Sequence, residues 1–189
     1  NKEDIIALTN KLTGWSLKDQ HSKQYQFQER MHAPGPKLFL GRTIAEAGEQ
    51  EGVEALTILA NHPSTAKFIA TKIARYFVAD EPPQTVIDQL AAQFTKTNGY
   101  LPSVFATLLA LPETWQYRLS KFKDSYDFVI SAYRATAIDP TLRRIKSDFN
   151  ALSYRPFNAL SPAGNADDAA GIISPDALKI RIEWAYRFA

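Results

Sequence analysis

Residues 62–83 read HPSTAKFIATKIARYFVADEPP, and this stretch decides the fold. Pro63 disfavours helical geometry at the residue before it, while Ser64 or Thr65 can accept hydrogen bonds from the first free amides of a helix. The two prolines that close the stretch cannot continue a helix, because each lacks an amide donor. The pattern therefore predicts one helix that begins near Ser64 and ends before the paired prolines.

Apolar residues recur through this predicted helix at spacings of three to five, which favours a single apolar face. That face comprises Phe68, Ile69, Ile73, Tyr76 and Phe77. Basic residues lie mostly elsewhere on the helix. We therefore expect a core helix with a basic outer side, followed by a second helix over residues 84–97 that Asn98 and Gly99 end.

The rest of the chain shows the same alternation of apolar helical patterns and breakers. Further helices are expected over residues 3–12, 53–61, 102–111 and 176–188, with another after Pro140. Residues 24–28 alternate polar and aromatic side chains, which is typical of an extended segment. We predict an all-α, orthogonally packed multi-helix domain over residues 1–189, with at most a short extended hairpin near residues 23–40.

Composition limits the function classes that need to be considered. The chain has 189 residues, of which 45% are hydrophobic, so it can bury a sizeable core. It has no cysteine, which excludes disulfides and thiolate chemistry. The sequence has no apolar run long enough for a transmembrane segment. A net charge of +2 is too small to favour nucleic acid as a partner, so none is expected.

Motifs for enzyme chemistry are missing from the sequence itself. The three histidines, His21, His32 and His62, lack the spacing of a helical zinc motif, and we predict no metal site. Neither a glycine-rich phosphate loop nor a nucleophile elbow is present. No particular cofactor is indicated.

Two groups of residues are candidates for ligand binding. His62 precedes a helix N-terminus, where amides and the helix dipole favour an anion, and Thr65 and Lys72 could share that site. The alternative, which we favour, is that His62 is a structural residue that caps the preceding helix while Pro63 fixes the corner. Arg143 and Arg144 lie in the most basic region, residues 118–155, and could bind an anionic group, although a solvated helix surface is the simpler interpretation.

Several short motifs occur in a specific order along the chain. They are Leu-Thr-Gly-Trp at residues 12–15, Lys-Leu-Phe-Leu-Gly at 37–41, His-Pro-Ser-Thr-Ala at 62–66 and the run that ends in Pro-Pro at 83. In this order they resemble the bacterial family catalogued as domain of unknown function 1800, and the resemblance runs over nearly the whole chain. It implies the C-terminal part of a longer exported protein, located in the periplasm or outside the cell. It also implies a co-encoded, exported sulfatase-like protein as a partner.

One motif departs from the family pattern. Where the family usually has a His-Asp pair, this chain has His32 followed by Ala33. If that pair binds a metal or transfers protons in relatives, this chain should do so poorly. We therefore assign no catalytic role to His32.

Two hypotheses of function follow. The first is a non-catalytic binding or accessory module of an exported bacterial protein. The alternative is an enzyme whose active site is completed by a missing N-terminal part, with His62, Thr65 and Lys72 nearest the chemistry.

Overall fold

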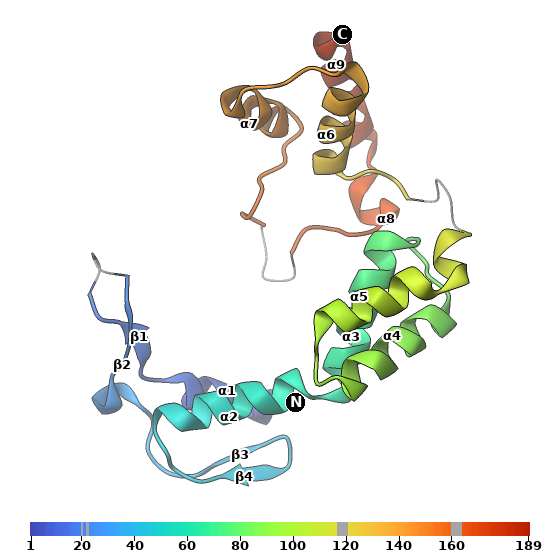
Figure 1. Ribbon diagram of the computed structural model, residues 1–189. Helices are drawn as coiled ribbons and strands as arrows, with labels where there is room; N and C mark the ends of the chain where they lie inside the picture. Colours follow the sequence, from blue (N-terminus) through green and yellow to red (C-terminus); the bar gives the residue numbers. More distant parts are fainter. Residues whose placement is uncertain (20, 22, 117–120, 160–163) are drawn as a thin grey trace. The chain divides into compact units, whose positions relative to one another are not determined.

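The computed structural model describes residues 1–19, 21, 23–116, 121–159 and 164–189 (Figure 1). The described chain is mostly helical, with two short antiparallel hairpins, which confirms the predicted fold class. Its contacts group the residues into two compact units. Unit 1 comprises Asn1–Ala66 and Thr95–Gly99, and unit 2 comprises Lys67–Phe94 and Tyr100–Ala189. That residues 1–189 form a single domain stays a prediction.

Unit 1 is built on two helices, α1 (Lys2–Leu12) and α2 (Glu49–Ala60). Between them the chain forms β1 (Trp15–Leu17), β2 (Tyr25–Phe27), the short 3-10 helix η1 (Glu29–Met31), β3 (Lys37–Phe39) and β4 (Arg42–Ile44). The small apolar core joins helices and hairpin through Ala7, Phe39, Ile44 and Ala55. The polar residues described below lie beside this core.

The hairpins are the part of unit 1 that the sequence underestimated. We expected at most one near residues 23–40, whereas β1 pairs with β2 and β3 pairs with β4. The β3–β4 turn consists of Leu40 and Gly41, both of which have positive φ, as tight two-residue hairpin turns require. Strand β1 escaped notice because three residues directly after a helix show no period-two pattern.

Unit 2 contains two groups of helices. The first includes most of α3 (Pro63–Phe77) and α4 (Gln84–Lys96), together with α5 (Leu101–Ala110) and the short η2 (Pro112–Trp115). These three α-helices lie side by side (Figure 1). Helix α3 begins one residue before the predicted start, and α4 follows the two prolines as expected.

The buried face of α3 differs from the prediction. Its fully buried residues are alanines spaced four apart, Ala66, Ala70 and Ala74, whereas Phe68 is 59% exposed and Phe77 is 52% exposed. The expectation that the large aromatic residues form the core face was therefore wrong. Small side chains allow close packing of a helix, so the methyl groups are buried and the larger rings lie outside.

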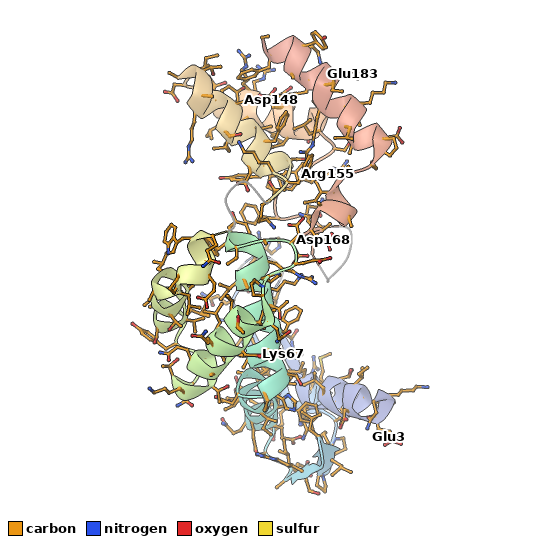
Figure 2. The ribbon with its side chains drawn as sticks, turned by 90° about the vertical axis from the view of Figure 1, so that its right-hand side faces the viewer. Glu3, Lys67, Asp148, Arg155, Asp168 and Glu183 are labelled. Atoms are coloured by element: carbon orange, nitrogen blue, oxygen red, sulfur yellow. The ribbon has the colours of Figure 1, made fainter. Side chains whose placement is uncertain are left out.

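The second group in unit 2 is formed by α6 (Ser125–Thr136), α7 (Leu142–Ala151), the short α8 (Ala169–Ile172) and α9 (Pro175–Phe188). Its core comprises Val129, Tyr133, Phe149, Leu152 and Trp184. Asp148, labelled in Figure 2, belongs to α7. It accepts hydrogen bonds from the Tyr133 hydroxyl and, at 3.0 Å, from the Trp184 indole. This carboxylate therefore connects the three long helices of the group.

Candidate functional site

A buried ionic cluster in unit 1 is centred on the carboxylate of Glu51. Lys37 Nζ donates to Oε2 at 2.7 Å, and His32 Nε2 lies 3.0 Å from Oε1. The amide of Ala47 donates to the same Oε1 at 3.0 Å. The Glu51 side chain is fully buried, and those of Lys37 and His32 are almost fully buried. One carboxylate is thus contacted by a lysine amine, a histidine ring nitrogen and a backbone amide.

The residues around the cluster come from two of the sequence motifs. His32 Nδ1 donates to the carbonyl of Thr13 at 2.8 Å, and the Thr13 hydroxyl accepts from the amide of Ala33 at 2.8 Å. Lys37 Nζ also donates to the carbonyl of Gly35 at 3.0 Å. The Leu-Thr-Gly-Trp motif and the segment around His32 and Lys37 therefore lie together, because each supplies hydrogen-bonding groups to the other.

The hydrogen bonds around Glu51 determine the charge state of its carboxyl group. The two ring nitrogens of His32 lie beside oxygen atoms, Nδ1 beside Thr13 O and Nε2 beside Glu51 Oε1. Burial raises the pKa of the Glu51 carboxyl. Hydrogen bonds from Lys37, Ala47 and His32 outweigh that effect and lower the pKa to about 2. Glu51 is therefore an anion at neutral pH.

Lys11 adds a further buried amine at the edge of this cluster. Its side chain is completely buried, and Nζ donates to the carbonyl of Lys37 at 3.4 Å. Burial lowers the pKa of Lys11, the charge of Glu51 opposes that shift, and the charge of Lys37 adds to it. The four side chains thus place three basic groups around one acid.

The cluster is arranged for cohesion rather than for access to a substrate. Its polar groups bind each other and the backbone, and they hold the 32–47 segment against α1 and α2. Sequence analysis missed Glu51 and Lys11. The signal in the sequence was the glycine that follows Glu51, because a glycine in a helix often has a packing reason. In the structure this pair lies on the inner side of α2, where a Cβ at Gly52 would lie 2.7 Å from the indole ring of Trp15.

The predicted site at His62 has a clear local structure. His62 Nδ1 accepts a hydrogen bond from the amide of Ser64 at 3.1 Å, and its carbonyl accepts from the amides of Thr65 and Ala66. The Thr65 hydroxyl donates to the carbonyl of Leu59 at 2.7 Å. The first amides of α3 are thus already bonded, and Thr65 ties α3 to the end of α2.

A hollow of about 460 Å³ lies next to His62 in unit 1. It is lined by Leu40, Arg42, Thr57, Ile58, Asn61, His62 and Pro63. Arg42 contributes a guanidinium from β4. The structure thus brings His62 together with an arginine that sequence reasoning did not connect with it.

Lys72 takes part in a separate polar network of unit 2. Its Nζ donates to Asp167 Oδ2 at 2.6 Å, and Arg75 lies 3.7 Å from the other oxygen. Hydrogen bonds from Lys72 lower the pKa of Asp167 more than burial raises it. Asp80 accepts from Lys121 at 2.8 Å and from the amide of Ala169 at 2.7 Å. Lys72 therefore forms an ion pair with Asp167. It lies two helical turns along α3 from Thr65.

The two predicted arginines on α7 differ in their surroundings. Arg144 lies about 6 Å from the ring centres of Tyr133 and Phe188, within the range of a cation–π contact. Arg143 is exposed. Arg118, at the start of the basic region, lies outside the described residues. Both arginines are therefore exposed at the surface, and Arg144 in addition lies near the rings of Tyr133 and Phe188.

The described residues contain neither a cluster of metal-binding side chains nor a helix that could span a membrane. Within the described ranges, no three acidic or histidine side chains gather closely enough to hold a metal ion. Among the helices described, none has both the length and the apolar character needed to cross a membrane.

Comparison with known proteins agrees with the motif resemblance. A family model described as "Protein of unknown function (DUF1800)" matches residues 1–189. Neither the curated proteins nor the solved structures gave a match.

Proposed function

This chain belongs to the DUF1800 family of proteins of unknown function, and from that premise we propose that it is a non-catalytic binding or accessory module of an exported bacterial protein. The proposed location is the periplasm or the cell exterior. The proposed partner is a co-encoded, exported sulfatase-like protein. The support for a binding role is an apolar surface on the last helix.

Helix α9 presents large apolar side chains to solvent along one face. Leu178, Ile182 and Tyr186 recur every four residues and are 40%, 58% and 83% exposed. The buried residues of this helix are Arg181, beside that face, and Trp184, on the opposite side. An exposed apolar face with this regular spacing favours a surface that another protein covers. This face is the single observation that carries the proposal.

The test is capture of the co-encoded protein by the full-length protein. We expect wild-type protein to retain it specifically and Tyr186→Lys to weaken retention, because a lysine amine would be desolvated in an apolar interface. Glu183→Lys is the matched control, since it introduces the same residue at an exposed position of the same helix. Failure of the wild-type protein to capture the neighbour, or equal loss in both variants, would contradict the proposal.

A second candidate function is an enzyme whose active site is completed by a further N-terminal part. The hollow beside His62 and Arg42 favours it, because it combines an imidazole ring with a guanidinium around a space of about 460 Å³. A protein with His62, Thr65 and Lys72 all replaced is the test. Unchanged activity and ligand affinity in this folded variant would rule the candidate out.

A further inference from the structure

Arg181 is a buried cation without a carboxylate partner. Its residue is only 7% exposed, and its guanidinium lies 4.7 Å from the ring centre of Phe122 and 5.3 Å from that of Phe128. One nitrogen donates to the carbonyl of Lys123 at 2.7 Å. In the part of the chain that the structure describes, no acidic side chain forms an ion pair with it. A guanidinium has five donors, and among the described residues Lys123 is the one partner that accepts a hydrogen bond from it.

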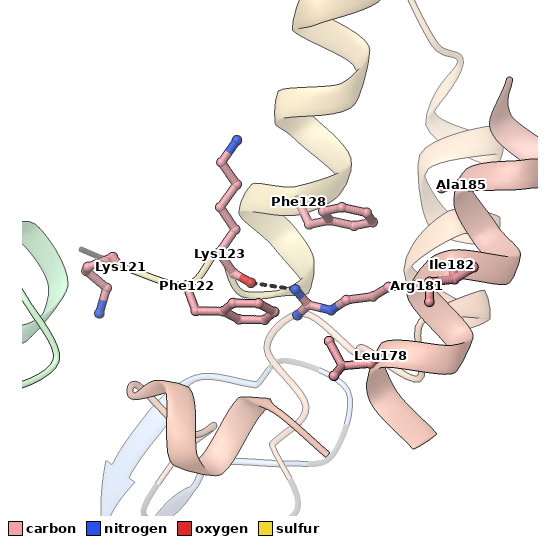
Figure 3. A pocket seen from close by; sticks show the side chains of 8 residues that line it. All are labelled: Lys121, Phe122, Lys123, Phe128, Leu178, Arg181, Ile182 and Ala185. Carbon is pink, nitrogen blue, oxygen red and sulfur yellow. Dashed lines mark hydrogen bonds between the residues drawn. The ribbon is translucent and has the colours of Figure 1, made fainter. Parts of the chain in front are cut away.

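The guanidinium lies at an apolar groove of about 390 Å³ in unit 2 (Figure 3). The walls are formed mainly by Phe122, Phe128, Leu178, Ile182 and Ala185. Arg181 extends from α9 toward the backbone of Lys123, between the aromatic rings and Leu178 (Figure 3). The groove surface is therefore almost entirely apolar, and the Arg181 guanidinium lies at its edge, against the two aromatic rings. Apolar walls with very few polar groups are the usual composition of a small-molecule site.

The neighbouring charges do not satisfy Arg181. The carboxylate of Asp124 is the nearby anion, but it caps α6 by accepting from the amide of Asp127 at 2.7 Å. Lys121, also at the groove, has its amine bound to Asp80 and to two carbonyls. Burial lowers the pKa of Arg181 and the charge of Asp124 raises it less strongly. An arginine stays charged in spite of such a shift, so an anionic ligand would be favoured here.

We propose that this groove binds an amphipathic carboxylate, with the carboxylate paired to Arg181 and the apolar chain lying against Phe122, Phe128 and Ile182. A planar guanidinium can hold a carboxylate through two parallel hydrogen bonds. The aromatic and aliphatic walls would remove the chain from water. The groove shares Leu178 and Ile182 with the α9 face proposed above, so a partner on that face and a ligand in the groove would use overlapping surface, but ligand binding itself needs only the free chain.

Decanoate is the probe that tests the site. Binding to the 189-residue chain is followed by amide shifts in a nuclear magnetic resonance titration, at decanoate concentrations below micelle formation. We expect saturable shifts at residues 122–128 and 178–185. Acetate, which has only the head group, and decanol, which has only the chain, should each bind at least about tenfold more weakly, since a charge-assisted hydrogen bond and apolar burial both contribute.

Three variants decide which residues are responsible. Arg181→Gln should weaken decanoate binding at least about tenfold, whereas Arg187→Gln, at an exposed position of the same helix, should leave it unchanged. Ala185→Phe fills the groove from an exposed position and should abolish binding without removing the guanidinium. Circular dichroism establishes that each variant is folded.

The outcomes separate cleanly. The proposal is overturned if wild-type protein shows no saturable shifts, if decanol binds as well as decanoate, or if folded Arg181→Gln keeps full affinity. Where Arg181→Gln fails to fold, Ala185→Phe decides: loss of binding supports the site, and retained binding refutes it. Because the titration contains no second protein, its failure leaves the capture experiment on Tyr186 unaffected.

Discussion

At the scale of single residues, the most constrained position is Glu51. Its carboxylate is fully buried and is hydrogen-bonded by two basic side chains, Lys37 and His32, and by the amide of Ala47. A buried ion pair contributes little to stability compared with a well-packed apolar pair. Removal of one partner is nevertheless strongly destabilising, because it leaves the other charge buried and uncompensated. This asymmetry determines how substitutions in the cluster should behave.

Replacement of Glu51 by glutamine should lower the free energy of unfolding by about 3–5 kcal/mol, because Lys37 would lose its counter-charge in a buried site and His32 would lose its carboxylate partner. Chemical denaturation measures the loss. Glu54→Gln, at an exposed position of the same helix, is the control and should change stability by less than about 0.5 kcal/mol. Equal effects in the two variants would show that Glu51 carries no buried charge.

Acid should weaken unit 1 through the same carboxyl. The folded-state pKa of Glu51, about 2, lies below its ordinary value of 4.5. Its ionised form therefore stabilises the fold above about pH 4.5, and this contribution of about 3 kcal/mol is lost as the pH falls toward 2. Denaturation at several pH values measures the slope. Glu51→Gln should flatten it, and an unchanged slope in that variant would contradict the assignment.

At the scale of elements, the contact between α2 and β1 depends on a missing side chain. Gly52 lies inside α2, and the indole ring of Trp15 occupies the space where a Cβ would be. A glycine inside a helix is normally unfavourable, and alanine at such a position usually stabilises. Here the close approach of the ring reverses the sign of the stability change that alanine would cause.

Gly52→Ala should therefore destabilise the protein by about 1–3 kcal/mol, because the added methyl group overlaps Trp15. Thermal unfolding provides the measurement. Combining it with Trp15→Phe, which removes the contacting part of the indole, should recover some of the loss relative to the sum of the single variants. A stabilising Gly52→Ala would mean that the ring moves aside freely.

The start of α3 tests whether His62 is structural. His62→Ala removes the acceptor for the Ser64 amide and should cost about 1 kcal/mol, whereas His62→Asn can still accept that bond and should retain most of the stability. Denaturant midpoints compare the two. If asparagine restores stability but any measured ligand affinity or activity is still lost, His62 has a role beyond capping.

At the scale of the whole molecule, the two compact units have separate sets of stabilising contacts. The Glu51 cluster belongs entirely to unit 1, and the Asp148 contacts with Tyr133 and Trp184 belong entirely to unit 2. Contacts of this kind stabilise the regions that contain them, and hydrogen exchange reports such local stability.

Substitutions in one cluster should therefore loosen the unit that holds it. Glu51→Gln should speed amide exchange in β3 and β4, while Asp148→Asn should speed it in α6 and α9. Hydrogen exchange followed by mass spectrometry gives both readings on the same chain. Equal acceleration throughout the chain in both variants would show a single cooperative structure.

Much of the secondary structure could be predicted from local sequence. Pro63, Pro82 and Pro83 act within a turn of their own positions, so the bounds of α3 and the start of α4 were recovered. The buried face of α3 was not, because periodicity marks apolar residues by type, whereas close packing selected Ala70 and Ala74. His62 was expected to cap the preceding helix, whereas its ring accepts a hydrogen bond from the amide of Ser64 at the start of α3.

The sequence by itself determined the family, the mostly helical class and the positions of the main helices, since these depend on short motifs and on residues a few positions apart. Only the tertiary structure decided that His32, Lys37 and Glu51 form one ionic cluster and that Arg181 lies at an apolar groove. Lys123 and Arg181 are 58 positions apart, yet a hydrogen bond joins them. Such contacts depend on how whole elements pack, and the strength of a buried charge depends on the solvent that packing removes.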